Sequence, residues 1–146
     1  MAYLPVLAEE VQDVQLAEPK LLIADDDRDF RESLGEVFER RGYGIRLAAD
    51  GQEAVEIAQS LSPLHLVLFD VHMPRKTGLQ ALCELRQAEL LLPCILMSAK
   101  LDDAIVKQAD ELETCGVLAK PFTLRDLTTT VERVLLQVYG GGEQPL

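Results

Sequence analysis

The chain has few basic residues, few cysteines and no long apolar run, and each shortage excludes a class of protein. Its 14 lysines and arginines stand against 25 acidic residues, and the formal net charge of −11 argues against binding to nucleic acid or to an anionic membrane surface. No apolar stretch reaches the roughly 20 residues of a membrane span. No basic segment precedes the short apolar "YLPVL" near the start, which argues against a signal peptide.

The number and spacing of the cysteines exclude two further classes of protein. Cys83, Cys94 and Cys115 are odd in number and show no CxxC spacing, so neither a disulfide framework nor a zinc site is expected. Reduced thiols in the core fit a cytoplasmic location. With 48% hydrophobic and 27% charged residues among 146, the composition is that of a globular chain with one domain.

Three parts can be distinguished along the chain. Residues 1–18 contain four acids and no bases, and we expect an N-terminal extension there with a short helix around 8–17. Residues 19–139 form the predicted folded domain. Residues 140–146, "GGGEQPL", are predicted to be a flexible tail.

The predicted domain alternates between two hydrophobic patterns. Five short apolar runs, typical of buried strands, lie at residues 20–24, 45–49, 64–69, 93–98 and 116–119. Each is followed by a segment with helical periodicity, the third from residue 78 to about 89 and the fourth over about 102–113. Five strands alternating with five helices predict an α/β, doubly wound parallel sheet with helices on both faces.

Polar side chains gather where the predicted strands end. Ligand sites of open α/β sheets lie beyond the carboxyl ends of the strands. The residues there are Asp25, Asp26 and Asp27 after the first strand, Asp70 after the third, Ser98 at the end of the fourth and Lys120 after the fifth. Taken singly, Asp27 is also explained as a helix N-cap, Ser98 as a hydroxyl bonding the backbone and Lys120 as a surface lysine. Asp70 has no such explanation, because an ionised carboxylate beside a buried strand needs compensation.

Convergence of these groups would create a site for a cation. Asp25, Asp26 and Asp70 would repel one another, and Mg²⁺, which takes oxygen ligands from carboxylates, water and phosphate, would relieve the repulsion. Lys120 would add a second positive charge. An aspartate held in this way can act as a nucleophile that accepts a phosphoryl group.

Four motifs, in this order, resemble the receiver domain of two-component response regulators. They are "LLIADDD" (21–27), "LVLFDVHMP" (66–74) with Gly78, "ILMSA" (95–99) and "LAKPF" (118–122). The resemblance covers about residues 19–139. It implies a flavodoxin-like sheet of order 2-1-3-4-5, the order known from the chemotaxis regulator of this same family.

The resemblance also implies a role for each site residue. Asp70 would be the phospho-acceptor, Asp26 a direct Mg²⁺ ligand and Asp25 a ligand mainly through water. The backbone carbonyl of His72 would bind the metal as well. Ser98 would be the switch hydroxyl that turns toward the phosphoryl group, and Lys120 would bridge to it, followed by a cis bond to Pro121.

Two departures from the family pattern concern three residues. Val117 stands where the family often has Tyr or Phe, which predicts altered coupling between the site and the surface. In the family, the positions of His72 and Lys100 line the approach to the acyl phosphate and tune its lifetime, so the resemblance implies the same for these two residues. His65, at the start of the third predicted strand, is expected to have no catalytic role.

The expected function is a phosphorylation-dependent switch rather than a metabolic enzyme. A sensor histidine kinase or phosphotransfer protein would phosphorylate Asp70 with Mg²⁺, and a downstream protein would bind at about residues 101–139. Only seven residues follow Tyr139, so no DNA-binding output domain is expected within the chain, and the expected state is a monomer or weak homodimer. The alternatives are a haloacid-dehalogenase-like phosphatase, which would need a second Asp where His72 stands, an unphosphorylated receiver scaffold, and a structural Mg²⁺- or Ca²⁺-binding domain.

Overall fold

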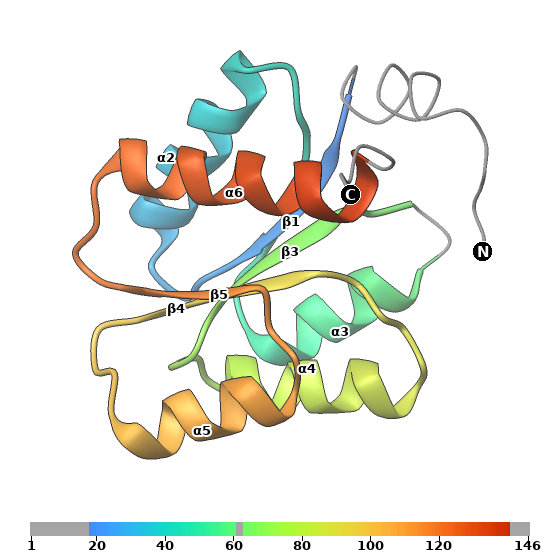
Figure 1. The fold of residues 1–146 in the computed structure, drawn as a ribbon, viewed down its shortest axis with the longest axis vertical. Helices are drawn as coiled ribbons and strands as arrows, with labels where there is room; N and C mark the ends of the chain where they lie inside the picture. The colour runs from blue at the N-terminus through green and yellow to red at the C-terminus, as the bar shows by residue number, and fades with distance from the viewer. Residues whose placement is uncertain (1–17, 61–62, 141–146) are drawn as a thin grey trace, which may run out of the picture.

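A parallel sheet of five strands forms the centre of the molecule, as the computed structural model shows for residues 18–60 and 63–140 (Figure 1). The strands are β1 (Lys20–Ala24), β2 (Gly44–Ala48), β3 (Leu66–Asp70), β4 (Cys94–Ser98) and β5 (Gly116–Ala119). Their order in the sheet is β2-β1-β3-β4-β5, and every neighbouring pair is parallel. The predicted fold class and strand order are therefore confirmed.

Helices follow the strands in the predicted alternation. In the described ranges they are α2 (Arg28–Arg40), α3 (Gly51–Gln59), α4 (Gly78–Gln87), α5 (Asp103–Glu111) and α6 (Leu124–Tyr139). A side-chain oxygen accepts a backbone N–H bond at the start of each one, which satisfies a donor that the first turn leaves unpaired. The capping residues are Asp27, Asp50, Thr77, Asp102 and Thr123. Asp27 is thus the N-cap that its sequence position allowed.

The boundaries differ from the predicted ones by one or two residues. β3 begins at Leu66 instead of residue 64 and includes Asp70, which the apolar pattern had placed just beyond the strand. β2 and β4 are each displaced or trimmed by one residue. The helix predicted to reach about residue 89 ends at Gln87, since Glu89 adopts a left-handed φ of 63° that no helix can continue through. The helix predicted over 102–113 spans Asp103–Glu111, with Asp102 and Leu112 as its caps.

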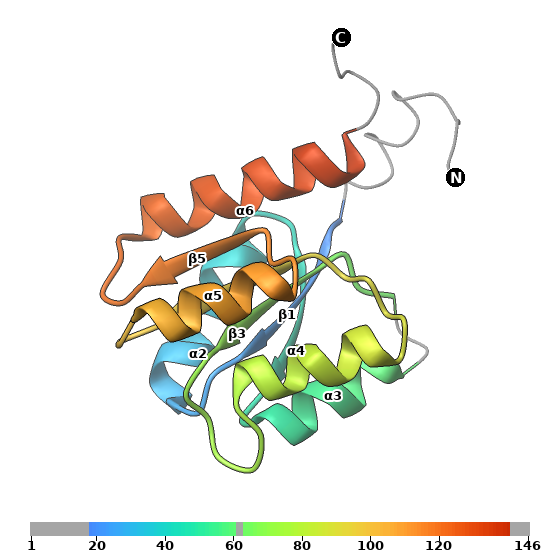
Figure 2. The ribbon, with the colours of Figure 1, turned by 60° about the horizontal axis from the view of Figure 1, so that its bottom comes forward.

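Alternate residues of the central strands supply two cores, one on each face of the sheet. On one face Leu21, Ile23 and Leu68 pack with α2 and α6, and on the other Leu22, Val67 and Phe69 pack with α3, α4 and α5. Figures 1 and 2 show this division of helices between the two faces. Each fully buried large apolar side chain contributes about 1.5–3 kcal/mol, so burial on both faces explains why these strands are uninterrupted apolar runs.

Arg86, in the last turn of α4, joins the carboxyl ends of α4 and α5. Its guanidinium donates to the carbonyls of Leu90 and Leu92 beyond α4, at 3.2 and 2.9 Å, and to that of Leu112 at the end of α5, at 3.1 Å. These helices are therefore joined at their carboxyl ends, away from the carboxyl edge of the sheet.

At the amino ends of the strands, polar groups gather around His65. Its Nδ1 atom accepts a hydrogen bond from the Lys20 backbone N–H at 2.9 Å, and its carbonyl accepts one from the Tyr139 hydroxyl at 2.8 Å. The Tyr139 ring lies edge-on to the imidazole, with centroids 5.3 Å apart. Burial and the nearby Lys20 charge lower the pKa of His65. The cluster joins the end of α6 to the starts of β1 and β3, in agreement with a structural role for His65.

The predicted N-terminal extension and tail lie almost entirely outside the described residues, as does the helix expected around residues 8–17. In the part of the chain that the structure describes, no helix has both the length and the apolar character needed to cross a bilayer.

Candidate functional site

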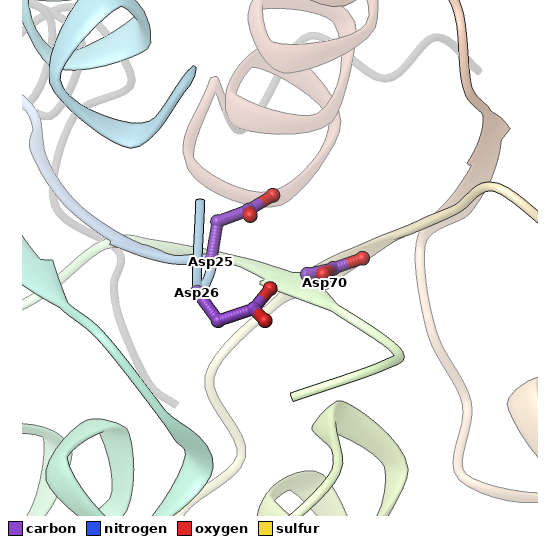
Figure 3. A group of neighbouring side chains, drawn as sticks. All are labelled: Asp25, Asp26 and Asp70. Carbon is purple, nitrogen blue, oxygen red and sulfur yellow. The ribbon is translucent and has the colours of Figure 1, made fainter. Parts of the chain in front are cut away.

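Three carboxylates meet at the carboxyl edge of the sheet. Asp25 and Asp26 directly follow β1, and Asp70 is the last residue of β3, the strand paired with β1. One carboxylate oxygen from each lies within 4.8 Å of those of the other two, and Figure 3 shows the three side chains around a common space. The predicted convergence of the three carboxylates is therefore present in the structure.

Lys120 supplies a positive charge to this cluster. Its Nζ atom lies 2.7 Å from Asp25 Oδ2 and 3.4 Å from Asp70 Oδ1. The bond between Lys120 and Pro121 is cis, as the resemblance implied. Lys120 therefore offsets part of the negative charge of Asp70, which is buried at the end of β3.

The charge compensation is incomplete. Asp70 is only 5% exposed, and burial, together with the neighbouring Asp25 charge, raises its pKa even though Lys120 acts in the opposite direction. For Lys120, burial alone would lower the pKa, but its hydrogen bond to Asp25 and the charges of Asp25 and Asp70 outweigh burial and raise it. A cluster with this excess of negative charge gains by taking up a cation.

The oxygens of the three carboxylates are not equally available to a metal ion. Both oxygens of Asp25 are engaged, one by Lys120 and the other by the backbone N–H of Asp27 at 2.9 Å. Asp26 is exposed and makes no hydrogen bond or ion pair within the described ranges. Carboxylate oxygens are the donors that Mg²⁺ prefers, so the cluster fits this ion, with Asp26 and Asp70 as the accessible ligands.

The loop between β3 and α4 is held firmly beside the cluster. Gly78 N–H donates to the Val71 carbonyl at 2.9 Å, and the backbone of Gly78 packs directly on the Asp70 carbonyl, where a Cβ would overlap the oxygen. Arg75 pairs with Asp50 at 3.0 Å, and Lys76 pairs with Glu84 at 3.1 Å. This loop carries His72, whose side chain is exposed.

Ser98 ends β4 next to Asp70, because Asp70 is paired in register with Met97. Its side chain is fully buried, and its Oγ atom is hydrogen-bonded to both the N–H and the carbonyl of Lys100, each at 3.0 Å. A backbone-bonded hydroxyl was one interpretation of Ser98 from sequence. A further contact was not predicted, between Ser98 Oγ and His72 Nε2 at 3.2 Å.

Two other residues of the site were missed. The Lys120 ammonium lies 4.5 Å from the centre of the Phe30 ring, within the range of a cation–π interaction, and Arg31 donates to the Asp25 carbonyl at 2.7 Å. Both side chains belong to the first turn of α2, just after the Asp27 cap. Asp27 as an N-cap gave the only sequence signal, since it places the next residues at the sheet edge.

The remaining predicted positions surround this cluster. Val117 is half-buried and packs against the core on the α3, α4 and α5 face. Lys100 is exposed and contacts Ser98 through its backbone. The roles predicted for Asp70, Ser98, Lys120 and the His72 carbonyl concern a bound ion or phosphoryl group and stay predictions.

Comparison with known proteins finds similar sequences and similar solved structures. A family model described as the response regulator receiver domain matches residues 21–132. Response regulator RR06 of Streptococcus pneumoniae is 34% identical over 119 residues, which are 82% of this chain and 54% of the relative. Transcriptional regulatory protein PdtaR of Mycobacterium tuberculosis is 36% identical over 122 residues, covering 82% of this chain and 58% of the relative. The chain thus spans about half the length of the curated relatives it matches.

Solved structures agree in fold. The chemotaxis protein CheY4 of Vibrio cholerae is 28% identical, with a TM-score of 0.74 over 81% of this chain and 99% of that one. A CheX–CheY–BeF₃–Mg²⁺ complex from Borrelia burgdorferi is 26% identical, with a TM-score of 0.74 over 80% of this chain and 88% of that one.

Proposed function

Since this chain belongs to the response regulator receiver domain family of two-component signalling, we propose that it is phosphorylated on Asp70 by a sensor histidine kinase or a phosphotransfer protein. One observation carries the proposal: the Asp70 carboxylate lies 3.4 Å from Lys120 and within 4.8 Å of oxygens of Asp25 and Asp26. A phosphoryl group needs this combination of a nucleophile with nearby positive charge and metal ligands.

The transfer would exchange one bond to phosphorus for another. An Asp70 oxygen forms the new O–P bond, the N–P bond to the donor's phosphohistidine breaks, and its electron pair returns to the imidazole nitrogen. Asp26, Asp70, the His72 carbonyl and, through water, Asp25 would hold Mg²⁺, which neutralises charge on the phosphoryl oxygens when bound. Lys120 is within reach to pair with the same oxygens, at the cost of its contact with Asp70.

We further propose that the chain is a regulatory phospho-acceptor that assists its own phosphorylation and dephosphorylation, and is not a metabolic enzyme. The added charge would change the surface formed by about residues 101–139, which are α5, β5 and α6. Exposed apolar side chains there, Val106, Leu124 and Leu136, support a protein as the downstream partner, and the acidic composition argues against nucleic acid as the direct one. All three cysteines are free thiols, which supports a cytoplasmic location, and we expect a monomer or weak homodimer.

The proposal is tested by incubating the protein with acetyl phosphate and Mg²⁺ and measuring its intact mass. We expect one labile phosphoryl adduct that is absent without Mg²⁺ and absent in Asp70→Asn. The matched control is Asp110→Asn, which removes an exposed carboxylate of α5 and should leave the adduct intact. Steady turnover of phosphomonoesters would favour a phosphatase instead, and no adduct at all would favour an unphosphorylated scaffold.

A further inference from the structure

The Ser98 hydroxyl has three hydrogen-bond partners, as many as a hydroxyl can have. It contacts the Lys100 carbonyl, the Lys100 N–H and His72 Nε2, at 3.0, 3.0 and 3.2 Å. Within the described residues no hydrogen bond joins it to Asp70 or Lys120. The hydroxyl is therefore fully occupied by groups outside the carboxylate cluster.

The direction of each hydrogen bond follows from a proton count. A hydroxyl has one proton and two acceptor positions, and a carbonyl can only accept. The Ser98 proton is therefore directed to the Lys100 carbonyl, and the Lys100 N–H fills one acceptor position. His72 must then donate from a protonated Nε2 atom into the last position.

We propose that His72 is a positioning residue that holds the Ser98 hydroxyl in its resting orientation and releases it when a phosphoryl group forms on Asp70. This inference rests on the proposed function. To donate to a phosphoryl oxygen, the Ser98 proton must leave the Lys100 carbonyl, and the Oγ atom must turn away from its other partners. A hydrogen bond to a charged oxygen is stronger than one to a neutral carbonyl, which favours the exchange once the phosphoryl group is present.

The surroundings of His72 determine which surface responds when His72 releases the Ser98 hydroxyl. His72 lines a cavity of about 520 Å³ between α4 and α5, together with Thr77, Cys83, Ile105 and Gln108. Its side chain is exposed, so the freed imidazole has space on this side. Val117 has no polar atom in its side chain and cannot bond to Ser98. His72 therefore links the buried hydroxyl to the surface between α4 and α5.

The test measures the affinity for beryllofluoride, a phosphoryl mimic, at saturating Mg²⁺ so that metal affinity does not enter. Loss of the resting hydrogen bond in His72→Ala should tighten binding by about three- to tenfold, the range expected for one net hydrogen bond. His72→Gln, whose amide can donate from a similar distance, should restore an affinity close to that of the wild type. In a Ser98→Ala background, His72→Ala should change nothing.

A spectroscopic measurement on the unmodified protein completes the test. The Nε2–H signal of His72 should be observable by NMR in the resting protein and should be lost or shifted on addition of Mg²⁺ and beryllofluoride. Equal affinities for wild type, His72→Ala and His72→Gln, or an effect of His72→Ala that persists without Ser98, would overturn the inference. Failure of the wild type itself to bind beryllofluoride would instead overturn the proposed function.

Discussion

The two ends of the sheet treat their polar groups in opposite ways. At the amino ends of the strands, His65 Nδ1 accepts from the Lys20 backbone N–H, the His65 carbonyl accepts from Tyr139, and the Lys20 ammonium is paired with Glu18 at 3.1 Å. At the carboxyl ends, three carboxylates share one ammonium group, and the pKa of Asp70 is raised by burial and by Asp25.

This contrast separates stability from function within a single sheet. The amino end is satisfied by the chain's own groups, whereas the carboxyl end holds unfavourable negative charge that a bound cation would relieve. Removing the charge of Asp70 at the carboxyl end should therefore stabilise the protein, whereas removing a hydrogen-bonded group at the amino end should destabilise it.

The largest effect is expected from Gly78→Ala, which would break the carboxyl end. The new Cβ would overlap the Asp70 carbonyl oxygen and lie 3.0 Å from its carbon, so the end of β3 must move. We expect a loss of about 2 kcal/mol in the free energy of unfolding, measured with urea, together with weaker Mg²⁺ binding. Gly116→Ala is the control, since its Cβ would meet Thr130 at an ordinary 3.7 Å; equal effects of the two substitutions would refute the prediction.

Asp70→Asn should stabilise the metal-free protein by removing the unfavourable charge at the carboxyl end. Asp70 has a raised pKa, so its contribution to stability is fully present below the ordinary value of 3.8 and is lost as the pH rises through the folded-state pKa. At neutral pH the ionised group therefore destabilises the metal-free protein. We expect the substitution to raise Tm by about 3–5 °C, as a gain near 1 kcal/mol would.

The matched control is again Asp110→Asn, which should leave Tm nearly unchanged because its carboxylate is exposed. Added Mg²⁺ should raise the Tm of the wild type more than that of Asp70→Asn. A lower Tm for metal-free Asp70→Asn would show that the carboxylate is stabilised in a way that its burial and neighbours do not explain.

The smallest expected effect is the response of the amino end to acid. The pKa of His65 is lowered from 6.5 by burial and by Lys20, so the folded state binds its proton less readily than the unfolded state does. Its contribution to stability is present above pH 6.5 and is lost as the pH falls toward the folded-state pKa. Protonation of Nδ1 would also end its hydrogen bond with Lys20.

This pH dependence is measured by urea unfolding between about pH 7.5 and 5.5, a range that spans the ordinary histidine pKa. His65→Asn keeps an acceptor near the position of Nδ1 but cannot titrate there. The difference in free energy of unfolding between the wild type and His65→Asn should therefore shrink as the pH falls. A constant difference across the range would rule out His65 as the source.

The sequence predicted the parts of the fold that depend on local pattern and parallel topology. β1, β3 and β4 are nearly or fully buried and appear as apolar runs, and once all strands are parallel, Asp25, Asp70, Ser98 and Lys120 must share one edge. The exact end of α4 was not predictable, because it depends on a left-handed Glu89 where the sequence has no glycine.

Contacts between side chains of different loops were beyond the sequence as well. The bond between His72 and Ser98 depends on how the loop after β3 folds over the end of β4, and the stacking of Lys120 on Phe30 depends on how α2 leaves the sheet. Neither contact leaves a spacing or a periodicity in the chain, whereas the three clustered carboxylates do.

The contact between α4 and α5 is closed at the carboxyl ends of the two helices, where Arg86 binds three carbonyls, and is open at the other end. At the closed end the charged guanidinium of Arg86 ties both helices together, and separating them there would break its hydrogen bond to the Leu112 carbonyl. The cavity between the two helices reaches Val71, the residue that follows Asp70, and His72. We therefore expect α4 and α5 to separate more readily at the end next to β3 than at the end that Arg86 holds.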